Sequence, residues 1–471
     1  MTILLLTLLA CTSTEKGDDS GRVRPTDTGT AIDTGGDPEI SGLSVTTVAD
    51  MTAVFIVEWD TLSPATSWVE FGPATAYGLT TVPSATPATH HKIVVVGAPF
   101  GADWHWRAAS DVGGTVAYSA DQVHSGGQKP AGLHGYDREA FDRSKVDGGI
   151  RMIPYFTSSV AGIQVVNADG DLVWHHEYES PEGTIQVAQT EDGSGLLYMI
   201  GDLTRRTDIG EIRYLSWDRS TTWSIRAEWA HHDFQLLPDG SWAFLAADIR
   251  ERDGELVAGD AVIRMDADGG NPRSIWSTWD HLEIPSFTGC RPTYYPDYCD
   301  WTHANGLWYE ASNDTFAVSI HNDDTIYVMD ADGDKLYAFG SADYADVQPA
   351  TPEDAFVQQH GAEYLGANQW AIFDNGEYPP DGHSRALILD VDPAASTFEA
   401  TWIYDWGSRY SSTILGDHDV LPNGNHLLSW GSEAEVTEVT DEGELVWQLA
   451  FDLGASLGFV GYEATAGGVI P

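Results

Sequence analysis

Histidines recur at one position of a repeated sequence module. His232 stands in HHDFQLLPDGSW and His360 in QQHGAEYLGANQW, and the two align when their turns, LPDGSW and LGANQW, are superposed. His303, in DWTHANGLWYE, matches them if its turn is a few residues longer, and His418 sits two residues further along its module. An imidazole can act as a nucleophile, exchange protons near neutral pH or ligate a metal. Several imidazoles at one register therefore predict a functional pocket.

The alternative for any single histidine is a polar cap that satisfies the start of a strand. The recurrence of the position, with Trp301 and Asn305 beside His303, favours the pocket. Other histidines fall outside this register, and we interpret them as surface or structural residues. They are His175, His176, His281, His383 and His426, together with His90, His91 and His105 near the N-terminus.

The elements that must position these histidines are short strands. The stretch Cys299–Gly340 alternates strands with Gly, Asn and Asp turns, and similar modules begin near residues 185, 231, 360 and 417. The entrances lie roughly 45–70 residues apart, which is typical of a propeller with long blades. The innermost strands of a propeller line its channel, so residues at one repeat position form a ring. We expect about six blades, with the C-terminal tail supplying a strand missing from the first.

Metal binding is the main competing interpretation of these modules. The turn Asp330-Ala-Asp-Gly-Asp334 is rich in carboxylates, but it lacks the length and the closing glutamate of an EF-hand loop. Asp-Gly is also ordinary hairpin chemistry. A transition metal on several imidazoles is the other possibility. We expect no metal and no cofactor.

The sequence predicts an all-β protein with two folded parts. Residues 39–126 alternate polar and apolar positions over short runs, as in TSWVEFG and HWRAAS, which predicts a small antiparallel sandwich. This part resembles fibronectin type III domains. Residues 127–148 read as a polar connector, and residues 149–471 as the propeller.

The N-terminus predicts export and lipidation. Residues 1–11 are mostly apolar and end in Leu8-Leu9-Ala10-Cys11, the pattern of a bacterial lipobox whose cysteine is lipidated. Residues 12–38 are rich in Thr, Gly and Asp and predict a disordered tether. We therefore expect a lipid-anchored protein, periplasmic or at the cell surface. In an exported protein, Cys290 and Cys299 predict a short-loop disulfide that braces the segment before His303.

The charge of the chain excludes several classes of partner. Its 72 acidic and 23 basic residues give a net charge of −49, which repels nucleic acid and anionic lipid. We expect contact with a membrane only through the N-terminal lipid. An anionic substrate would need a local cationic pocket to overcome this field.

Four segments resemble the bacterial arylsulfate sulfotransferase family. They are HHDFQLLPDG, DWTHANGLWYEASNDTFAVS, QQHGAEYLGANQWAIFDNG and DVLPNGNHLLSWG, and the resemblance spans roughly Arg151–Gly461. It implies an exported six-bladed propeller that transfers a sulfuryl group from a phenolic sulfate to a phenol. It also implies that no nucleotide sulfate donor takes part.

The resemblance assigns roles to individual residues. His360 is implied as the nucleophile that forms a sulfohistidine. His303 and His232 are implied to bind the sulfuryl oxygens or to exchange protons with the phenol. The chain departs from the family at His321, which replaces an arginine, and at Gly361, which replaces an aspartate. The remaining residues that we expect to bind substrate are Asn305, Trp301, His418 and Asn375.

The departure at His321 keeps a second hypothesis open. Arginine carries a permanent charge and a bidentate fork for sulfate oxygens, whereas histidine is charged only when protonated. Arg409, just before the last module, is a candidate replacement. The alternative function is a non-catalytic surface propeller that binds a phenolic or sulfated ligand. A quinoprotein dehydrogenase is disfavoured by the histidine register and by the lack of adjacent cysteines.

Overall fold

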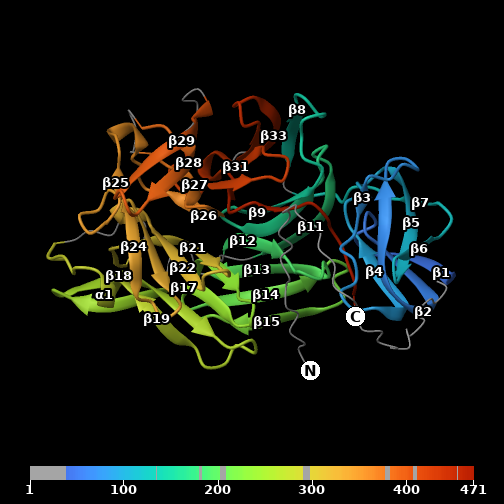
Figure 1. Cartoon of the computed structure of the whole chain (residues 1–471), viewed down its shortest axis with the longest axis horizontal. Coiled ribbons are helices and arrows are strands. Elements are labelled where there is room, and N and C mark those ends of the chain that lie inside the picture. Colours follow the sequence, from blue (N-terminus) through green and yellow to red (C-terminus); the bar gives the residue numbers. More distant parts are fainter. Residues whose placement is uncertain are drawn as a thin grey trace, which may run out of the picture.

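The computed structural model describes most of the two parts predicted to fold. The described residues are 39–133, 135–179, 183–201, 208–289, 297–376, 382–406, 411–452 and 454–470. The predicted signal with Cys11, the predicted tether, Cys290 and Arg409 lie outside them. Cys299 is disulfide-bonded. The predicted all-β class and six-bladed propeller are confirmed, and a smaller β unit lies beside the propeller (Figure 1).

The smaller unit is an antiparallel seven-stranded sheet organised around one long strand, β2. Its burial alternates along the strand, so that Phe55, Trp59 and Phe71 enter an aromatic core with Trp104 and Trp106. β2 pairs with β1 and β4 through its first half and with β3 and β5 through its second. The strands are β1 (Ile40–Thr47), β2 (Phe55–Gly72), β3 (Leu79–Thr80), β4 (Ala88–Val95), β5 (Asp103–Val112), β6 (Thr115–Tyr118) and β7 (Gln122–Ser125). The fibronectin type III resemblance stays a prediction.

The propeller follows in chain order, one antiparallel sheet for each blade. The first blade comprises β9 (Ile150–Phe156), β10 (Val160–Val166) and β11 (Leu172–Glu179). The second comprises β12 (Gly183–Gln189), β13 (Gly195–Gly201), β14 (Gly210–Ser216) and β15 (Thr222–Arg226). The third comprises β16 (Ala230–Leu236), β17 (Trp242–Arg252), β18 (Glu255–Met265) and β19 (Arg273–Ser277). In the third blade, β20 (Cys299–Asp300) adds in parallel beside β18.

The last three blades repeat the pattern. The fourth blade comprises β21 (Ala304–Glu310), β22 (Thr315–Ile320), β23 (Thr325–Asp330) and β24 (Lys335–Gly340). The fifth comprises β26 (His360–Gly366), β27 (Gln369–Asp374), β28 (Arg385–Asp392) and β29 (Thr397–Tyr404), with β25 (Gln348–Pro349) at the edge. The sixth comprises β30 (Asp417–Val420), β31 (His426–Trp430), β32 (Glu435–Val439) and β33 (Leu445–Phe451). The acidic turns act as hairpins: one oxygen of Asp330 accepts the N–H groups of Asp332 and Asp334 at 3.0 Å each.

The ring of blades closes with both ends of the propeller sequence. The C-terminal strands β34 (Ser456–Leu457) and β35 (Gly461–Glu463) pair with β9, which confirms the predicted contribution of the tail. The predicted connector also holds a strand, β8 (Tyr136–Ala140), which pairs with β33 as the outer strand of the last blade. An outer strand buries little side-chain surface, so its sequence carries a weak apolar signal.

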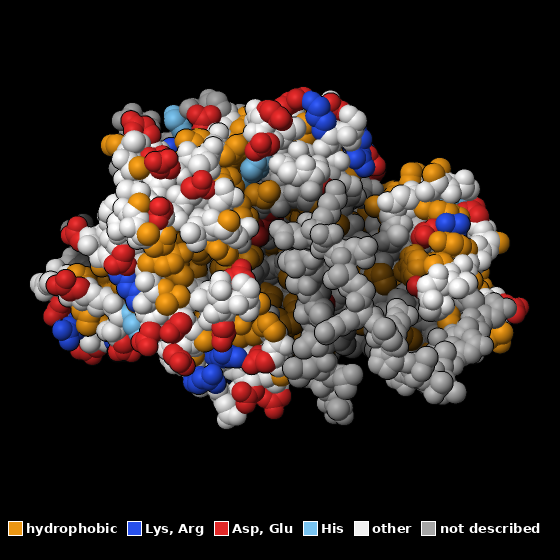
Figure 2. Space-filling view, viewed as in Figure 1, with side chains coloured by type: hydrophobic (Ala, Val, Ile, Leu, Met, Phe, Trp, Pro, Cys, Tyr) orange, Lys and Arg blue, Asp and Glu red, His pale blue; other side chains and the backbone are white. Residues whose placement is uncertain are grey.

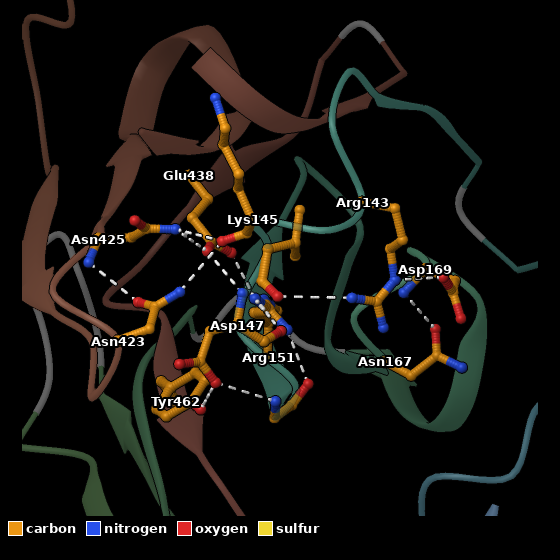
Figure 3. Close-up of polar contacts among 12 residues, drawn as sticks. Arg143, Lys145, Asp147, Arg151, Asn167, Asp169, Asn423, Asn425, Glu438 and Tyr462 are labelled. Carbon is orange, nitrogen blue, oxygen red and sulfur yellow. Dashed lines mark hydrogen bonds and ion pairs between the residues drawn. The ribbon is translucent and has the colours of Figure 1, made fainter. Parts of the chain in front are cut away.

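A buried ion pair locks the closing seam between the first and last blades (Figure 3). Arg151 on β9 donates to a carboxylate oxygen of Glu438 on β32 at 2.5 Å, and both side chains are 0% exposed. The other oxygen of Glu438 accepts from the Asn425 amide at 2.7 Å and from the backbone N–H of Asp147 at 2.8 Å. The seam therefore depends on a polar network whose hydrogen bonds compensate the buried charges.

The C-terminal segment also fastens the smaller unit to the propeller. It extends from the propeller towards β4 (Figure 1), where the N–H groups of Val82 and Val94 donate to the carbonyls of Gly467 and Gly468 at 2.9 Å each. Val469 forms a β-bridge with Ile93. A shared apolar core continues across this contact. The two parts therefore pack as one body through the last residues of the chain.

The visible surface is acidic, as the composition predicts. Asp and Glu side chains are scattered over the propeller, and Lys and Arg side chains occur in small separate groups (Figure 2). Within the described residues, no helix is long and apolar enough to cross a membrane.

Candidate active site

Four predicted histidines meet in a closed ring of contacts. The ring centroids of His232 and His303 are 5.4 Å apart, those of His303 and His321 5.0 Å, those of His321 and His360 5.3 Å, and those of His360 and His232 6.2 Å. All four side chains are buried. They come from β16, the segment before β21, the 3-10 turn η1 (His321–Asp323) and β26. The repeat register thus brings together side chains that are up to 128 residues apart in sequence (360 − 232).

The backbone is irregular where these side chains are placed. The register of the inner strands shifts just after Ala230, Ala304 and His360, as expected at β-bulges. His232 and His303 have φ angles of 58° and 49°, in the left-handed region. Such a conformation costs on the order of 1–3 kcal/mol per non-glycine residue and concentrates at functional sites. The surrounding blade structure must hold both residues in place.

The hydrogen bonds of Asn375 fix the tautomer of His360. The Asn375 amide nitrogen donates to the carbonyls of Ser412 and Leu415 at 2.7 and 2.8 Å, so its side-chain oxygen must face the ring. That oxygen lies 2.8 Å from Nδ1 of His360. An amide oxygen can only accept, so Nδ1 of His360 carries the hydrogen and Nε2 carries the lone pair. Burial lowers the pKa of His360 well below its usual range, which keeps the ring neutral.

His303 is held in the same way by a carboxylate. Its Nδ1 lies 2.7 Å from an oxygen of Asp300, three residues earlier on β20. The carboxylate accepts the Nδ1 hydrogen and can stabilise the imidazolium that forms when Nε2 takes a proton. His303 is therefore suited to proton exchange.

His321 is a neutral hydrogen-bond acceptor. Asn322 donates its amide to the carbonyls of Asp300 and Trp301 and presents its oxygen to Nδ1 of His321 at 2.8 Å. Burial, and then the neighbouring His303, lower the pKa of His321 to about 3. At neutral pH this residue therefore cannot supply the charge of an arginine. Its Nε2 presents a lone pair instead.

Two residues that sequence reasoning missed stand behind His232. Nδ1 of His231 lies 3.0 Å from Nδ1 of His232, and Nε2 of His231 lies 3.2 Å from an oxygen of Asp260 on β18. The repeat register selects His232 and not His231. The pair HH in the sequence was the available signal for His231, whereas the contribution of Asp260 depends on the pairing of strands.

The other predicted substrate-binding residues have different positions. Asn305 lies at a bulge, where its amide donates to the Gln359 carbonyl at 2.6 Å and its side-chain oxygen is buried without a hydrogen-bond partner. Trp301 packs on Trp279 with ring centroids 4.7 Å apart and supports the segment before His303. Asn375 contacts His360 through its side-chain oxygen and is not itself a member of the ring of histidines.

His418 does not join the four histidines, and the expectation for this residue is corrected. Its Nε2 lies 2.9 Å from Nδ1 of His426, and the His426 ring stacks on Trp402 at 3.7 Å. Side chains alternate along a strand, and Asp417 and Asp419 face the channel on β30. His418 therefore faces the neighbouring sheet.

The channel holds a cavity of about 290 Å³ lined by carboxyl groups. Burial raises the pKa of Asp233 and Asp419 to about 7 and that of Glu363 to about 9, and it raises the pKa of Asp417 well above its usual range. In sequence these acids were indistinguishable from a solvated acidic surface. No group of three or more His, Cys, Asp or Glu side chains in the described parts of the chain is arranged to hold a metal ion.

The substitution at Gly361 has a steric explanation. Gly361 has a φ of 54°, and a Cβ there would lie 2.6 Å from Oδ1 of Asp417 and 3.0 Å from its Cα. The close approach of β30 thus leaves no room for the aspartate of the related pattern.

One family of known proteins matches most of the propeller sequence. The family model described as Arylsulfotransferase (ASST) matches residues 145–449, more than half of the chain. No curated protein matches the chain.

Similar solved structures share low sequence identity with the chain. A protein of unknown function from Bacteroides caccae has 12% identity and a TM-score of 0.39, covering 67% of this chain and 99% of that one. The periplasmic gluconolactonase PpgL of Pseudomonas aeruginosa has 12% identity and a TM-score of 0.38, covering 66% and 99%. A streptogramin B lyase has 10% identity and a TM-score of 0.38, covering 70% and 98%. We draw no functional inference from these three.

Proposed function

The chain belongs to the arylsulfotransferase family, and from this premise we propose that it transfers a sulfuryl group from a phenolic sulfate ester to a phenol through a sulfohistidine at His360. The observation that carries the proposal is the tautomer of His360. Asn375, itself held by two backbone carbonyls, leaves the lone pair of His360 on Nε2. A neutral imidazole with a fixed lone pair is a competent nucleophile.

The proposed reaction has two steps that share one covalent intermediate. Nε2 of His360 attacks the sulfur of the donor, the N–S bond forms, and the bond from sulfur to the aryl oxygen breaks. The departing phenolate takes up a proton from the site. In the second step a phenol loses its proton and attacks the sulfur, and the N–S bond breaks. The transition state is loose, so positioning and fixed donors contribute most of the rate.

His303 and His232 are the groups that exchange protons with the phenols or bind the sulfuryl oxygens. His232 lies beside His360, with ring centroids 6.2 Å apart, and His303 lies beside His232, with ring centroids 5.4 Å apart. Nδ1 of His303 lies 2.7 Å from the Asp300 carboxylate. A carboxylate behind an imidazole fixes the ring and stabilises its protonated form. Asp300 and Asn375 therefore act as positioning residues.

His321 supports the alternative proposal of a non-catalytic binding protein. Its Nδ1 is directed to Asn322 and its pKa is lowered to about 3, so it offers the sulfuryl oxygens no charge. It can accept a hydrogen bond from the hydroxyl of a phenol. If no other cation reaches the site, binding of a phenolic ligand without turnover is the expected activity.

We further propose that the protein is exported and anchored by a lipid on Cys11. The support is the sequence Leu8-Leu9-Ala10-Cys11 and the Thr-, Gly- and Asp-rich segment after it. Labelling of cells with a fatty acid tests this. Label is expected in the wild-type protein and absent from Cys11→Ser, and an unlabelled wild-type protein would overturn the proposal.

Mass spectrometry after mixing with 4-nitrophenyl sulfate tests the function. We expect the wild-type protein to gain one sulfuryl group on His360 and to release it when phenol is added. His360→Ala should gain none, and His426→Gln, which changes a buried histidine outside the ring, should behave as wild type. Wild-type protein with no adduct and no nitrophenol release over a broad range of pH and donors would exclude the transferase and leave the binding alternative.

A further inference from the structure

We propose that the acidic cavity in the propeller channel binds a small organic ammonium ion that carries an aromatic ring. This binding is independent of the proposed sulfuryl transfer. Asp233 and Gly361 line the cavity and directly follow His232 and His360, but none of the four ring histidines is among its described lining residues. The cavity is therefore a separate site that adjoins the ring of histidines.

The innermost strands of all six blades surround this cavity. β12, β16, β21, β26 and β30 each contribute lining residues, and β35, which pairs with β9, does so for the first blade. The volume of about 290 Å³ is at the small end of the roughly 300–1,000 Å³ that is typical of ligand pockets. A cavity of this size suits one small molecule.

Four carboxyl groups line the cavity without a basic partner. They belong to Asp233, Glu363, Asp417 and Asp419, and none of the described lining residues is Lys, Arg or His. A carboxylate that is removed from water is costly unless it is paired with a cation or fully hydrogen-bonded. The missing positive charge is what a cationic ligand would supply.

Asp233 has a buried oxygen that lacks a hydrogen-bond partner in the described structure. Its Oδ2 accepts from the Leu307 N–H at 2.7 Å, whereas its Oδ1 has no partner. The residue is only 7% exposed. Burial outweighs the donors around this carboxyl group and raises its pKa to about 7. A buried acceptor without a donor costs free energy, which an N–H group of a ligand would recover.

Glu363 and Asp419 supply a second acidic group from two neighbouring blades. Their side chains are hydrogen-bonded to each other, and burial raises the pKa of both. Two carboxyl groups that share one proton titrate as a pair and carry one negative charge between their two pKa values. Together with the ionised Asp233, the cavity thus presents two negative charges in mildly alkaline solution.

The rest of the wall is apolar and aromatic. Trp308 on β21, Phe459 before β35 and Tyr462 on β35 line it, together with Val187 and Val460. Aromatic faces attract an ammonium group and also pack on another aromatic ring. The described residues contain no group of three or more His, Cys, Asp or Glu side chains arranged for a metal ion. The wall therefore favours an arylalkylammonium ion over a metal.

Calorimetric titration of the full-length protein with 2-phenylethylammonium tests the proposal. At pH 8 Asp233, whose pKa is about 7, is mostly ionised, and an alkylammonium keeps its proton. Sodium chloride at 0.5 M shortens the Debye length to about 4 Å and screens the acidic surface. We expect one saturable site per chain and at least tenfold weaker binding of 2-phenylethanol, which has the same ring without the charge. No saturable binding, or equal affinity for both compounds, would overturn the proposal.

Cavity variants locate the site. Asp233→Asn should weaken binding by on the order of tenfold or more, because it removes a charge-assisted hydrogen bond. The double variant Glu363→Gln with Asp419→Asn removes the charge of the second acidic group and should have a similar effect. Glu442→Gln, which changes an exposed acid outside the cavity, is the matched control and should bind as wild type does.

Wild-type affinity in both cavity variants would overturn the proposal. Tighter binding of Ca²⁺ than of 2-phenylethylammonium, lost in the same variants, would also overturn it, because the cavity would then be a metal site. The comparison of the charged and neutral compounds uses the wild-type protein, so it does not depend on the folding of any variant. No sulfuryl transfer is measured, and the result therefore stands apart from the proposed function.

Discussion

The side-chain oxygen of Asn375 lies 2.8 Å from Nδ1 of His360, across the first hairpin of the fifth blade. Asn375 follows β27 directly, and His360 begins β26, where it pairs with Phe373. The adjacent Asp374 accepts the N–H groups of Val357 and Gly376 at 2.9 and 3.0 Å. The QHG and FDNG segments are therefore neighbours in space, and the second segment orients His360, the nucleophile that we propose.

Removing this amide should slow the first chemical step. In Asn375→Ala the ring of His360 loses the acceptor that keeps the hydrogen on Nδ1, so the lone pair no longer stays on Nε2. We expect the rate of adduct formation on His360 to fall on the order of 10²-fold, because a wrong tautomer removes the reactive lone pair. Single-turnover mass spectrometry with 4-nitrophenyl sulfate measures this rate.

Gln369→Ala is the control, because Gln369 lies on β27 in the same blade and bonds only to the exposed Asp390 in the described structure. It should leave the rate unchanged. Adduct formation at the wild-type rate in a folded Asn375→Ala protein would contradict the role of the amide.

Restoring an arginine at His321 should increase turnover. The neutral His321, whose pKa is about 3, offers no charge to the sulfuryl oxygens, whereas a guanidinium offers a permanent one. We expect His321→Arg to raise kcat/KM for aryl sulfates by about 10²–10³-fold, the contribution of one well-placed donor. The neutral variant His321→Gln should give no such gain, and steady-state kinetics compares the two. A folded arginine variant no faster than the glutamine variant would count against this account.

Repetition in the sequence was sufficient to predict the fold and the centre of the site. His232, His303 and His360 recur at one register, and the repeated blade geometry brings residues of one register close together in space. His321 was predicted from the resemblance alone, since it lies outside that register. Its burial and low pKa depend on the packing of the fourth blade.

The sequence did not predict the positions of residues that depend on pairing between distant strands. His418 was placed two residues along its module, but the channel-facing residues of β30 are Asp417 and Asp419, and alternation turns His418 away. The Asp260 carboxylate on β18 reaches His231 on β16 only because β17 pairs with both strands in the third blade. No local pattern encodes either relationship.

Neutralising Glu363 should protect the protein at alkaline pH. Burial, with the nearby Asp419, raises the pKa of Glu363 from 4.5 to about 9. The group is therefore protonated in the folded state and ionised in the unfolded state between these values, so its stabilisation is lost as pH rises towards 9. Glu363→Gln has no such loss. We expect its advantage over wild type to grow between pH 5 and pH 9 by more than about 1.4 kcal/mol, the equivalent of one pKa unit.

Urea unfolding at pH 5, 7 and 9 measures the difference. The exposed Glu442→Gln is the control and should follow the wild type at each pH. A constant difference between Glu363→Gln and wild type across this range would show that Glu363 does not titrate between the two states.

Breaking the Arg151–Glu438 pair should open the seam of the propeller. Both side chains are 0% exposed, so Glu438→Ala leaves a buried guanidinium without its carboxylate. We expect the free energy of unfolding to fall by about 3–5 kcal/mol. The double variant Arg151→Met with Glu438→Met removes both charges and should recover much of this loss, although the Asn425 amide and the Asp147 N–H lose their acceptor.

Arg226→Ala provides the comparison on the surface, where Arg226 and Asp208 are 65% and 49% exposed and the loss should stay below about 1 kcal/mol. Hydrogen exchange locates the effect: β9, β32 and β35 should lose protection first in Glu438→Ala, because the ring opens where its first and last blades meet. Uniform loss of protection over all six blades would mean that the pair stabilises the whole ring cooperatively rather than the seam.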